Sequence, residues 1–564
     1  MRATMSALFL PTVLPLFLAL PQAPVGQAET APADDVRLIV LVSVDQMIPE
    51  QLDRLSPLFS GGLARFAEGE VWRTAAHGHG VTETGPGHAT LGSGVHPRSH
   101  GLISNDWLAP DNKDRLYCVA DPDVQLVGPG GPFSSPRQQR SPRNLRAPGL
   151  GDHLEAQVPE GKSVSIAAKD RAAIGTNGRA GDLVLWWDQT GRGFITSEAY
   201  ADSLPDFVKR WDANWTGILD AGQGSYFWKS QVPAEATLHG TMPDLRPGEA
   251  NLEDGTVFPH LAPGVTQDGF PSEIARLAKW MYFTPNVDTF SVEIAKRAVR
   301  ELQLGMDEHV DTLFVGLSAC DTAGHLFGPY SQEVTDVLLN ADRQLETLFK
   351  LLDERVGEGR WIAALSADHG VLPLPEYRVT QGQEGERVSG SDVGEALKAL
   401  RLALTERYSA DVMVGGHRNR LRLSAKAMTA GGFDPVEVRA FAAEFMRVEV
   451  PSLARVFTVD ELLAIPADAA LGLDPIATLM ARSTLKGRSP DVIWLRPSGT
   501  IDMRLGTTHG SPYGYDRNVP LAFIGVGSTP GHRWDKAWTV DVLPTLFMRA
   551  GLKVPAGLDG KVLK

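Results

Sequence analysis

The sequence contains very little cysteine. Two cysteines, Cys118 and Cys320, stand among its 564 residues, so a framework of disulfides is excluded. A single bridge between them stays open at this point. We expect Cys320, although it neighbours an aspartate, to be a small buried residue rather than a metal ligand.

Positive charge is also scarce, because 54 Lys and Arg stand against 68 Asp and Glu and the formal net charge is −14. Proteins that bind nucleic acid carry a basic face, so nucleic acid is not expected as a dedicated partner. A local basic pocket for a small anion is compatible with this charge. Beyond the N-terminal region, no apolar run is long enough to span a bilayer.

The N-terminal region has the pattern of a secretory signal. Arg2 precedes an apolar run over residues 7–20, which is too short for a transmembrane helix. Small residues at 25–28 then resemble an A-x-A cleavage site. We expect residues 1–28 to be removed as a signal peptide and the mature protein to be periplasmic or secreted. The alternative is a disordered or anchoring tail.

Four nearly continuous apolar runs predict strands that are buried on both faces, as in a parallel sheet. Helical patterns lie between them, for example at residues 291–304 and 332–352. This alternation predicts an α/β fold with a central, mostly parallel sheet flanked by helices. The four runs are residues 37–44, 312–318, 361–367 and 519–526.

Residues 35–564 are expected to form one catalytic domain with three insertions. The first two, 111–146 and 170–270, are rich in Pro and Gly and lack a clean helical period. The third, 373–496, mixes helical patterns with short strands. We interpret all three as cap or accessory elements around the sheet.

Polar residues follow three of the predicted strands, at the points where the apolar runs stop. Open α/β sheets place their sites at the carboxyl ends of strands, so these residues can converge although they are far apart in the sequence. Carboxylates and imidazoles are zinc ligands, and two zinc ions can clamp the attacking and leaving oxygens of a phosphoryl transfer. Each residue alone would more often be a helix cap, a turn or a surface residue. His325 lies four residues after one of these aspartates, and His509 lies in a later loop. With them, the candidate ligands are Asp45, Asp321, His325, Asp368, His369 and His509.

Thr84 is the candidate nucleophile. It lies in the loop 81–90, where glycines allow the backbone to approach an anion closely and the following residues resemble a helix start. A hydroxyl at a helix N-terminus beside a metal can attack phosphorus. Thr82 and Thr90 are competing hydroxyls, and the alternative for Thr84 is a helix N-cap without a catalytic role.

Lys169 and Arg171 form a second candidate group just beyond a strand-like segment at 163–168. Two residues apart on an extended chain, their side chains would point the same way and suit a dianionic phosphate. Asn105 offers a neutral amide donor to a phosphoryl oxygen. The alternatives are a solvated surface pair and a turn residue.

Together these residues resemble the alkaline phosphatase superfamily, which also contains the type I phosphodiesterases and nucleotide pyrophosphatases. They are most similar to its single-chain bacterial branch of broad-specificity phosphate monoesterases with a threonine nucleophile. The resemblance runs in order through nearly the whole mature chain. It is carried by residues 44–47, 84–89, 100–107, 169–171, 321–325, 368–370, 508–510 and 539–546.

The resemblance implies two zinc sites, one on Asp321, His325 and His509. The other would be held by Asp45, Asp368 and His369, with Thr84 bound to it as the nucleophile. It also implies that Asn105, Lys169 and Arg171 contact the phosphoryl oxygens, and that phosphate esters are hydrolysed through a phosphothreonine.

Three alternative functions are distinguishable in the sequence. A sulfatase should carry a Cys-x-Pro-x-Arg or Ser-x-Pro-x-Arg motif, and neither cysteine is followed by one. A phosphodiesterase or nucleotide pyrophosphatase would use similar metal ligands. Lys169 and Arg171 argue against that reading, because they would offset the extra charge of a monoester. A binding module without catalysis would need no nucleophile, and Thr84 argues against it.

Overall fold

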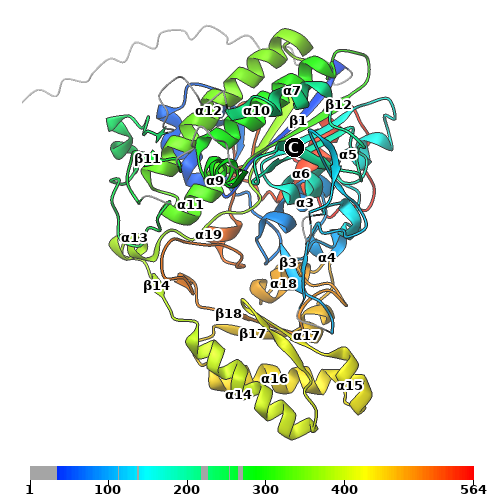
Figure 1. Cartoon of the computed structure of the whole chain (residues 1–564), viewed down its shortest axis with the longest axis vertical. Coiled ribbons are helices and arrows are strands. Elements are labelled where there is room, and N and C mark those ends of the chain that lie inside the picture. The colour runs from blue at the N-terminus through cyan, green and yellow to red at the C-terminus, as the bar shows by residue number, and fades with distance from the viewer. Residues whose placement is uncertain (1–34, 112–113, 136–138, 217–226, 253–254, 264–270) are drawn as a thin grey trace, which may run out of the picture.

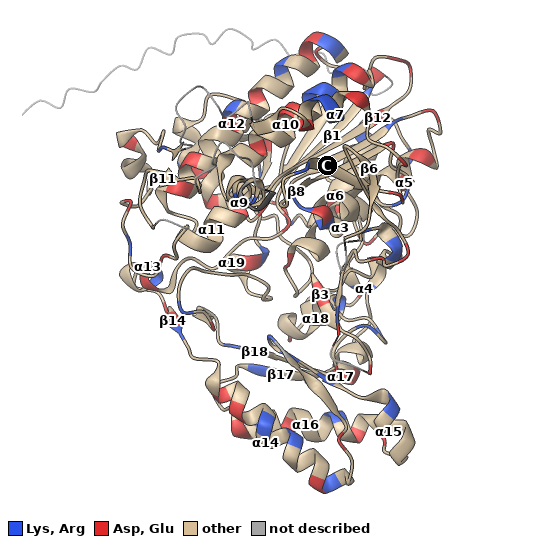
Figure 2. Cartoon of the chain, viewed as in Figure 1, with Lys and Arg blue, Asp and Glu red and all other residues tan. Residues whose placement is uncertain are grey.

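The computed structural model describes residues 35–111, 114–135, 139–216, 227–252, 255–263 and 271–564. The expected signal peptide at residues 1–28 lies outside this part of the chain. None of the helices within it has the length and apolar character needed to cross a membrane. Figure 2 shows acidic and basic residues interspersed along the helix labelled α14, Ser391–Tyr408, as on a solvated surface.

An 11-stranded sheet forms the centre of the molecule (Figure 1). In sheet order its strands are β21 (Gly531–Arg533), β2 (Glu70–Trp72), β20 (Ala522–Gly525), β13 (Trp361–Ser366), β1 (Leu38–Val44), β12 (Asp311–Leu317), β7 (Ser163–Ala167), β8 (Leu183–Asp188), β9 (Gly193–Ser197), β5 (Leu126–Gly128) and β6 (Gly131–Phe133). The five strands from β13 to β8 run parallel, whereas β20 and β9 pair antiparallel with them at the two flanks. The expected α/β fold is confirmed, with its parallel part confined to the middle of the sheet.

Both faces of the sheet are buried, as the apolar runs predict. In β1, Leu38, Val40 and Val42 belong to one hydrophobic cluster, whereas Ile39 and Leu41 belong to a second, because successive side chains of a strand point to opposite faces. Each cluster is completed by helices (Figure 1). The first contains α1 (Pro49–Leu55), α2 (Gly62–Ala67), α10 (Pro285–Glu301), α11 (Ala319–Phe327) and α12 (Gln332–Leu352), and the second contains α3 (Thr84–Ser93), α5 (Leu150–Glu155), α6 (Asp170–Asn177) and α20 (Val542–Arg549).

The parallel strands end at one level, which is what gathers distant residues. Ser43 of β1 lies beside Gly316 of β12 and Ser366 of β13, and Gly316 lies beside Ala167 of β7. The residues that follow these four positions therefore emerge at the same carboxyl edge of the sheet.

Two of the three expected insertions contain strands of the central sheet, so they are not accessory elements along their whole length. Segment 170–270 starts with α6, β8 and β9, and its Trp186 and Trp187 are buried in the core. Segment 111–146 supplies β5 and β6 at one edge. β5 and β6 have only three residues each, too few to show alternation, whereas β8 is a buried, apolar strand of the parallel centre that the expected boundaries overlooked.

The third insertion forms a separate lobe with its own hydrophobic cluster. We define the accessory lobe as residues 388–499, at the lower end of Figure 1. Its base is closed by a parallel pair of short strands, β14 (Glu386–Arg387) and β19 (Thr500–Ile501). It contains a four-stranded sheet with helices against it. In chain order the elements are α14, β15 (Met413–His417), β16 (Arg420–Leu423), α15 (Ala425–Gly431), α16 (Pro435–Glu449), β17 (Arg455–Thr458), α17 (Val459–Ala464), α18 (Pro475–Arg482) and β18 (Val492–Leu495).

Candidate active site

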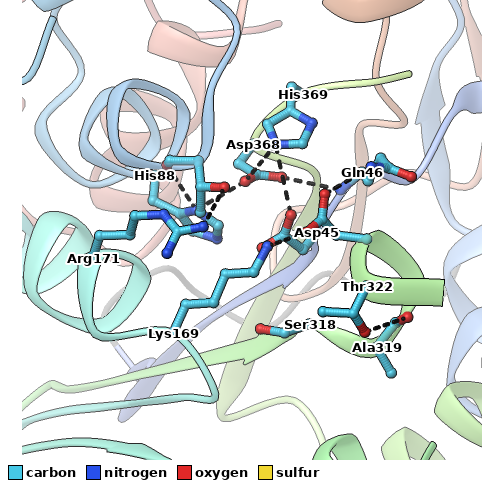
Figure 3. A network of polar contacts seen from close by, with 12 residues as sticks. Asp45, Gln46, His88, Lys169, Arg171, Ser318, Ala319, Thr322, Asp368 and His369 are labelled. Atoms are coloured by element: carbon cyan, nitrogen blue, oxygen red, sulfur yellow. Dashed lines mark hydrogen bonds and ion pairs between the residues drawn. The ribbon is translucent and has the colours of Figure 1, made fainter. Parts of the chain in front are cut away.

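The residues predicted at strand ends do meet at the carboxyl edge of the sheet. Asp45 follows β1, and Asp321 lies in the first turn of α11 after β12. Asp368 and His369 follow β13, and Lys169 follows β7. All five side chains are buried. Figure 3 shows Lys169 reaching toward Asp45, with Asp368 and His369 beyond it.

Asp321, His325 and His509 form the first group of metal-binding side chains. Their ligand atoms lie within 4.8 Å of one another. The Nδ1 atoms of His325 and His509 lie 2.7 Å from the carbonyl oxygens of Thr507 and Thr82. A carbonyl only accepts, so each Nδ1 carries the proton and each Nε2 keeps its lone pair for a metal. Both Nε2 atoms face Asp321 Oδ1, at 3.2 and 3.7 Å.

The second group surrounds Asp45. His369 Nε2 lies 3.6 Å from Asp45 Oδ1 and 3.2 Å from Asp368 Oδ2. Two sets of ligand atoms overlap here, one on Asp45, His88 and Asp368 and one on Asp45, Asp321 and His369. The two groups of metal-binding side chains therefore adjoin each other.

The chemistry of this second group fits a bound cation. Burial raises the pKa of Asp45 to about 7, and the neighbouring charge of Asp368 adds to this effect. Asp45 Oδ1, Asp368 Oδ2 and His369 Nε2 are buried and have no hydrogen-bond partner among the residues that the structure describes. Buried lone pairs without partners are costly, and carboxylates with imidazole are the donor set of zinc.

Thr84 is the first residue of α3, with Glu83 in an extended conformation before it. Thr84 Oγ1 accepts a hydrogen bond from Arg171 Nη2 at 3.2 Å. The two competing hydroxyls face elsewhere. Thr82 Oγ1 donates to the carbonyl of Ser511, and Thr90 Oγ1 lies 3.1 Å from His100 Nε2. Of the three hydroxyls, Thr84 is the one that faces the candidate phosphate-binding cations.

Gly87 lets α3 lie directly on the loop that carries Asp368. A Cβ atom on Gly87 would lie 1.9 Å from the carbonyl oxygen of Asp368, far inside van der Waals contact. Only glycine permits this approach without a backbone shift. The close packing joins the helix of the candidate nucleophile to the loop of two candidate ligands.

Lys169 and Arg171 both face the site, but not as residues of one extended segment. The strand β7 ends at Ala167, Lys169 is the extended residue before α6, and Arg171 lies in the first turn of that helix. The segment is too short to separate a strand from a helix by periodicity, so this expectation was wrong in its geometry. Lys169 Nζ lies 2.6 Å from Asp45 Oδ2 and 2.5 Å from Asp321 Oδ2.

Asn105 lies beside Thr84. Its Oδ1 accepts from the backbone N–H of Gly85 at 2.7 Å, which leaves Nδ2 as the donor of the amide. The side chain is thereby oriented by the first turn of α3, next to the hydroxyl of Thr84.

Sequence reasoning assigned no role to several residues that shape the site. His88 Nδ1 lies 3.3 Å from Asp368 Oδ2. Gln46, in a left-handed conformation with φ of 69°, donates from its backbone N–H to Asp368 Oδ1 and from Nε2 to Asp321 Oδ1. Gln46 thus links both groups of metal-binding side chains. A positive φ at a glutamine gives no signal in a single sequence.

The sequence over residues 39–500 matches the family of type I phosphodiesterases / nucleotide pyrophosphatases. The chain belongs to this family, which is part of the alkaline phosphatase superfamily. The resemblance found in the sequence is confirmed.

Characterised relatives cover almost the whole chain. Alkaline phosphatase PafA of Elizabethkingia meningoseptica is 29% identical over 551 residues, which are 95% of this chain and 95% of the relative. Alkaline phosphatase PhoK of Sphingomonas sp is 29% identical over 95% of this chain and 92% of the relative. The crystal structure of wild-type PafA matches with a TM-score of 0.80 at 26% identity, over 94% of this chain and 98% of that one.

Proposed function

We propose that this chain is an alkaline phosphatase that hydrolyses phosphate monoesters through a phosphothreonine at Thr84. One observation carries the proposal. The hydroxyl of Thr84 stands at the N-terminus of α3, in hydrogen-bond contact with Arg171. Thr84 precedes His88 by one turn of the same helix, and the ring of His88 lies within one set of neighbouring ligand atoms with Asp45 and Asp368. Relatives named alkaline phosphatase over 95% of the chain support the same activity.

The metal ligands are proposed to be Asp321, His325 and His509 for one zinc ion. Asp45, Asp368 and His369, with Thr84, would hold the other. His88 and Gln46 lie around the second group. Two bound zinc ions would supply Lewis acidity at the attacking and the leaving oxygen.

Side chains of this protein would supply the nucleophile and stabilise the negative charge that develops on it. The hydroxyl of Thr84 gives up its proton to solvent and Oγ1 forms a bond to phosphorus while the bond from phosphorus to the ester oxygen breaks; the departing alkoxide takes a proton from water and leaves as the alcohol. A water oxygen then attacks phosphorus and loses a proton, the bond to Thr84 Oγ1 breaks, Oγ1 takes up a proton to restore the hydroxyl, and inorganic phosphate leaves. The guanidinium of Arg171 and the N-terminus of α3 both stabilise negative charge on Oγ1.

Preference for a monoester rests on charge. A monoester carries one more negative charge than a diester. Arg171 and the Nδ2 of Asn105 provide a cation and a neutral donor beside Thr84, and Lys169 provides a second cation at the same edge of the sheet. Lys169 is held between Asp45 and Asp321. The family also contains phosphodiesterases, so phosphodiester hydrolysis is the alternative.

The test compares 4-nitrophenyl phosphate with bis(4-nitrophenyl) phosphate on the wild-type enzyme. These substrates share a leaving group and differ in the charge on phosphorus. We expect a higher kcat/KM for the monoester, and a higher value for the diester would assign the site to the alternative.

Export after cleavage of residues 1–28 remains a proposal drawn from the sequence. The N-terminal sequence of the protein recovered from the medium or the periplasm tests it. An N-terminus near Glu29 is the expected result.

A further inference from the structure

The carboxylate of Glu83 is fixed by three hydrogen-bond donors and one further guanidinium, although it lies next to the candidate nucleophile. Oε2 accepts from Ser104 Oγ at 2.7 Å and from the backbone N–H of Asn105 at 2.6 Å. Oε1 accepts from Arg420 Nη2 at 2.6 Å, and Arg418 Nη1 lies 3.6 Å away. The side chain of Glu83 is buried, with 4% of its surface exposed.

These contacts close a ring around Thr84. The side chain of Glu83 holds the backbone of Asn105, and the side chain of Asn105 holds the backbone N–H of Gly85. Glu83 and Gly85 are the residues on either side of Thr84. The position of the Thr84 hydroxyl and that of the Asn105 amide are thus fixed relative to each other by one closed set of hydrogen bonds.

Arg420 enters this ring from the accessory lobe. It is the first residue of β16 and is buried, and it follows a hairpin turn in which Arg418 has a φ of 52°. Besides Glu83, its Nη1 donates to Ser104 Oγ and, at 3.4 Å, to the carbonyl of Asp106. The described contacts of its guanidinium thus all go to Glu83 or to the short segment that carries Asn105.

Charge supports the same arrangement. Arg420 Nη2 lies 2.6 Å and Arg418 Nη1 lies 3.6 Å from Glu83 Oε1, so two guanidinium groups offset the negative charge of the carboxylate. The two carboxylate oxygens accept hydrogen bonds from three donors, which are Ser104 Oγ, the backbone N–H of Asn105 and Arg420 Nη2. Without Arg420 a buried negative charge would face Asn105 with little compensation, and Glu83 would turn toward solvent or another donor.

Arg422 provides an internal comparison. It lies two residues further along β16, so its side chain is on the same face of the strand and is similarly buried. Its Nη2 donates to the carbonyls of Arg488 and Leu108, and its Nη1 lies 3.7 Å from Asp491. Two of these three partners, Arg488 and Asp491, lie within the accessory lobe, and only Leu108 lies outside it, so Arg422 is a buried arginine of the same strand that does not contact Glu83.

We propose that Arg420 is a positioning residue through which the accessory lobe sets the geometry of the active site. It orients Glu83, which in turn fixes Asn105 against the first turn of α3. The accessory lobe then helps to set the positions of the residues that bind the phosphoryl group, in addition to packing against the rest of the molecule. The inference rests on the proposed function, because it takes Thr84 as nucleophile and Asn105 as a phosphoryl ligand.

The experiment is a double-mutant cycle with Arg420→Met and Asn105→Ala, with Arg422→Met as the matched control. The kcat/KM for 4-nitrophenyl phosphate, the Ki of inorganic phosphate, the zinc content and the Tm are measured for each variant. We expect Arg420→Met to lower kcat/KM by about 10- to 100-fold, the range typical of residues that support a ligand. In the Asn105→Ala background, Arg420→Met should lower kcat/KM by less than about threefold, because the effects of substituting residues that act as a unit are not additive.

Arg422→Met should lower the Tm by a similar amount but keep kcat/KM within about threefold of wild type. Equal losses from Arg420→Met with and without Asn105, or a loss matched by Arg422→Met, would overturn the inference and leave the proposed function intact. Wild-type activity of Asn105→Ala would instead overturn the assignment of Asn105, and the inference with it. If Arg420→Met does not fold, Arg420→Lys and Glu83→Gln are carried through the same cycle with the same expected coupling.

Discussion

Arg171 Nη2 donates to Thr84 Oγ1 across 3.2 Å, although 87 residues separate the two along the chain. The contact joins the first turns of two helices, α3 and α6, which pack against each other on one face of the sheet. A helix N-terminus attracts anions, so the two helix starts and the guanidinium form one region suited to negative charge. Thr84 supplies the oxygen on which that charge would develop.

Thr84→Ala should abolish turnover while leaving the fold intact. Removing a nucleophile typically costs about 10⁴-fold or more in kcat, because the first bond to phosphorus cannot form. The measurement is kcat for 4-nitrophenyl phosphate, with circular dichroism and zinc content as checks on structure. Thr90→Ala is the control hydroxyl. If Thr90→Ala lost as much activity while folded, or Thr84→Ala kept its activity, the nucleophile would be misassigned.

Lys169→Ala/Arg171→Ala should lose monoester hydrolysis selectively. The double variant removes two cations that offset the charge of a monoester, so we expect its kcat/KM to fall by about 10²-fold or more. Hydrolysis of bis(4-nitrophenyl) phosphate should fall much less. Parallel losses on both substrates would mean that the two side chains support the site without distinguishing the charge of the substrate.

Metal removal should inactivate the enzyme and weaken its fold. We expect about two zinc ions per purified chain by elemental analysis. A chelator should lower the Tm, because buried carboxylates such as Asp45 and Asp368 then lose their partner for folding. His509→Ala should retain about one zinc ion per chain. An active protein free of metal would exclude the proposed mechanism.

Gly87→Ala should disrupt the site through backbone displacement. The added methyl group would lie 1.9 Å from the carbonyl oxygen of Asp368, so α3 or the Asp368 loop must move. Activity should fall by about 10²-fold, since an error of about 1 Å in position can cost that much. Gly175→Ala is the control, because its Cβ would make ordinary contacts, with Ala89 as the neighbour at 3.5 Å. Similar activity of the two variants would contradict the argument.

Stability should decline with pH partly because of Asp212, which lies in α7 (Asp206–Asp212). Burial raises the pKa of this carboxyl to about 8, while its Oδ1 accepts from the backbone N–H of Phe194. Between pH 4 and pH 8 the unfolded chain holds fewer protons at this residue than the folded one. The free energy of unfolding therefore falls as pH rises through this range.

Asp212→Asn keeps the acceptor for Phe194 and removes the titration. We expect the variant to gain stability over wild type by about 1–3 kcal/mol at pH 9 relative to pH 5. Denaturant unfolding at pH 5, 7 and 9 measures the difference. A gain that does not change with pH would show that Asp212 is ionised in the folded state throughout.

The local fold was predictable wherever hydrophobic burial dictates it. The runs at residues 37–44 and 361–367 correspond to β1 (Leu38–Val44) and β13 (Trp361–Ser366), and the helical pattern at 332–352 corresponds to α12 (Gln332–Leu352). A strand buried on both faces must be apolar along its length, so it is visible in one sequence. Strands β5 and β9 lie outside the parallel centre, and their segments were taken for insertions. Strand β8 is an apolar strand of the parallel centre, and it was missed because it lies in the same Gly-rich and Trp-rich segment as β9.

The ligand groups could be anticipated because the ends of parallel strands meet. What could not be anticipated is contact that depends on side-chain placement across long separations. Gln46 donates to Asp321 only because its backbone adopts a positive φ. Glu83 contacts Arg420 only because a hairpin of the accessory lobe reaches the segment just before Thr84. The periodicity and spacing of residues in a single sequence do not predict such long-range side-chain contacts.

The contact between His509 Nδ1 and the carbonyl of Thr82 spans 427 residues of chain. In the proposed function His509 is a zinc ligand, so a nascent chain that ends before residue 509 lacks one ligand of the first group. Such a chain would not hydrolyse esters, because hydrolysis would require residue 509 to reach the carbonyl of Thr82, which is synthesised long before it.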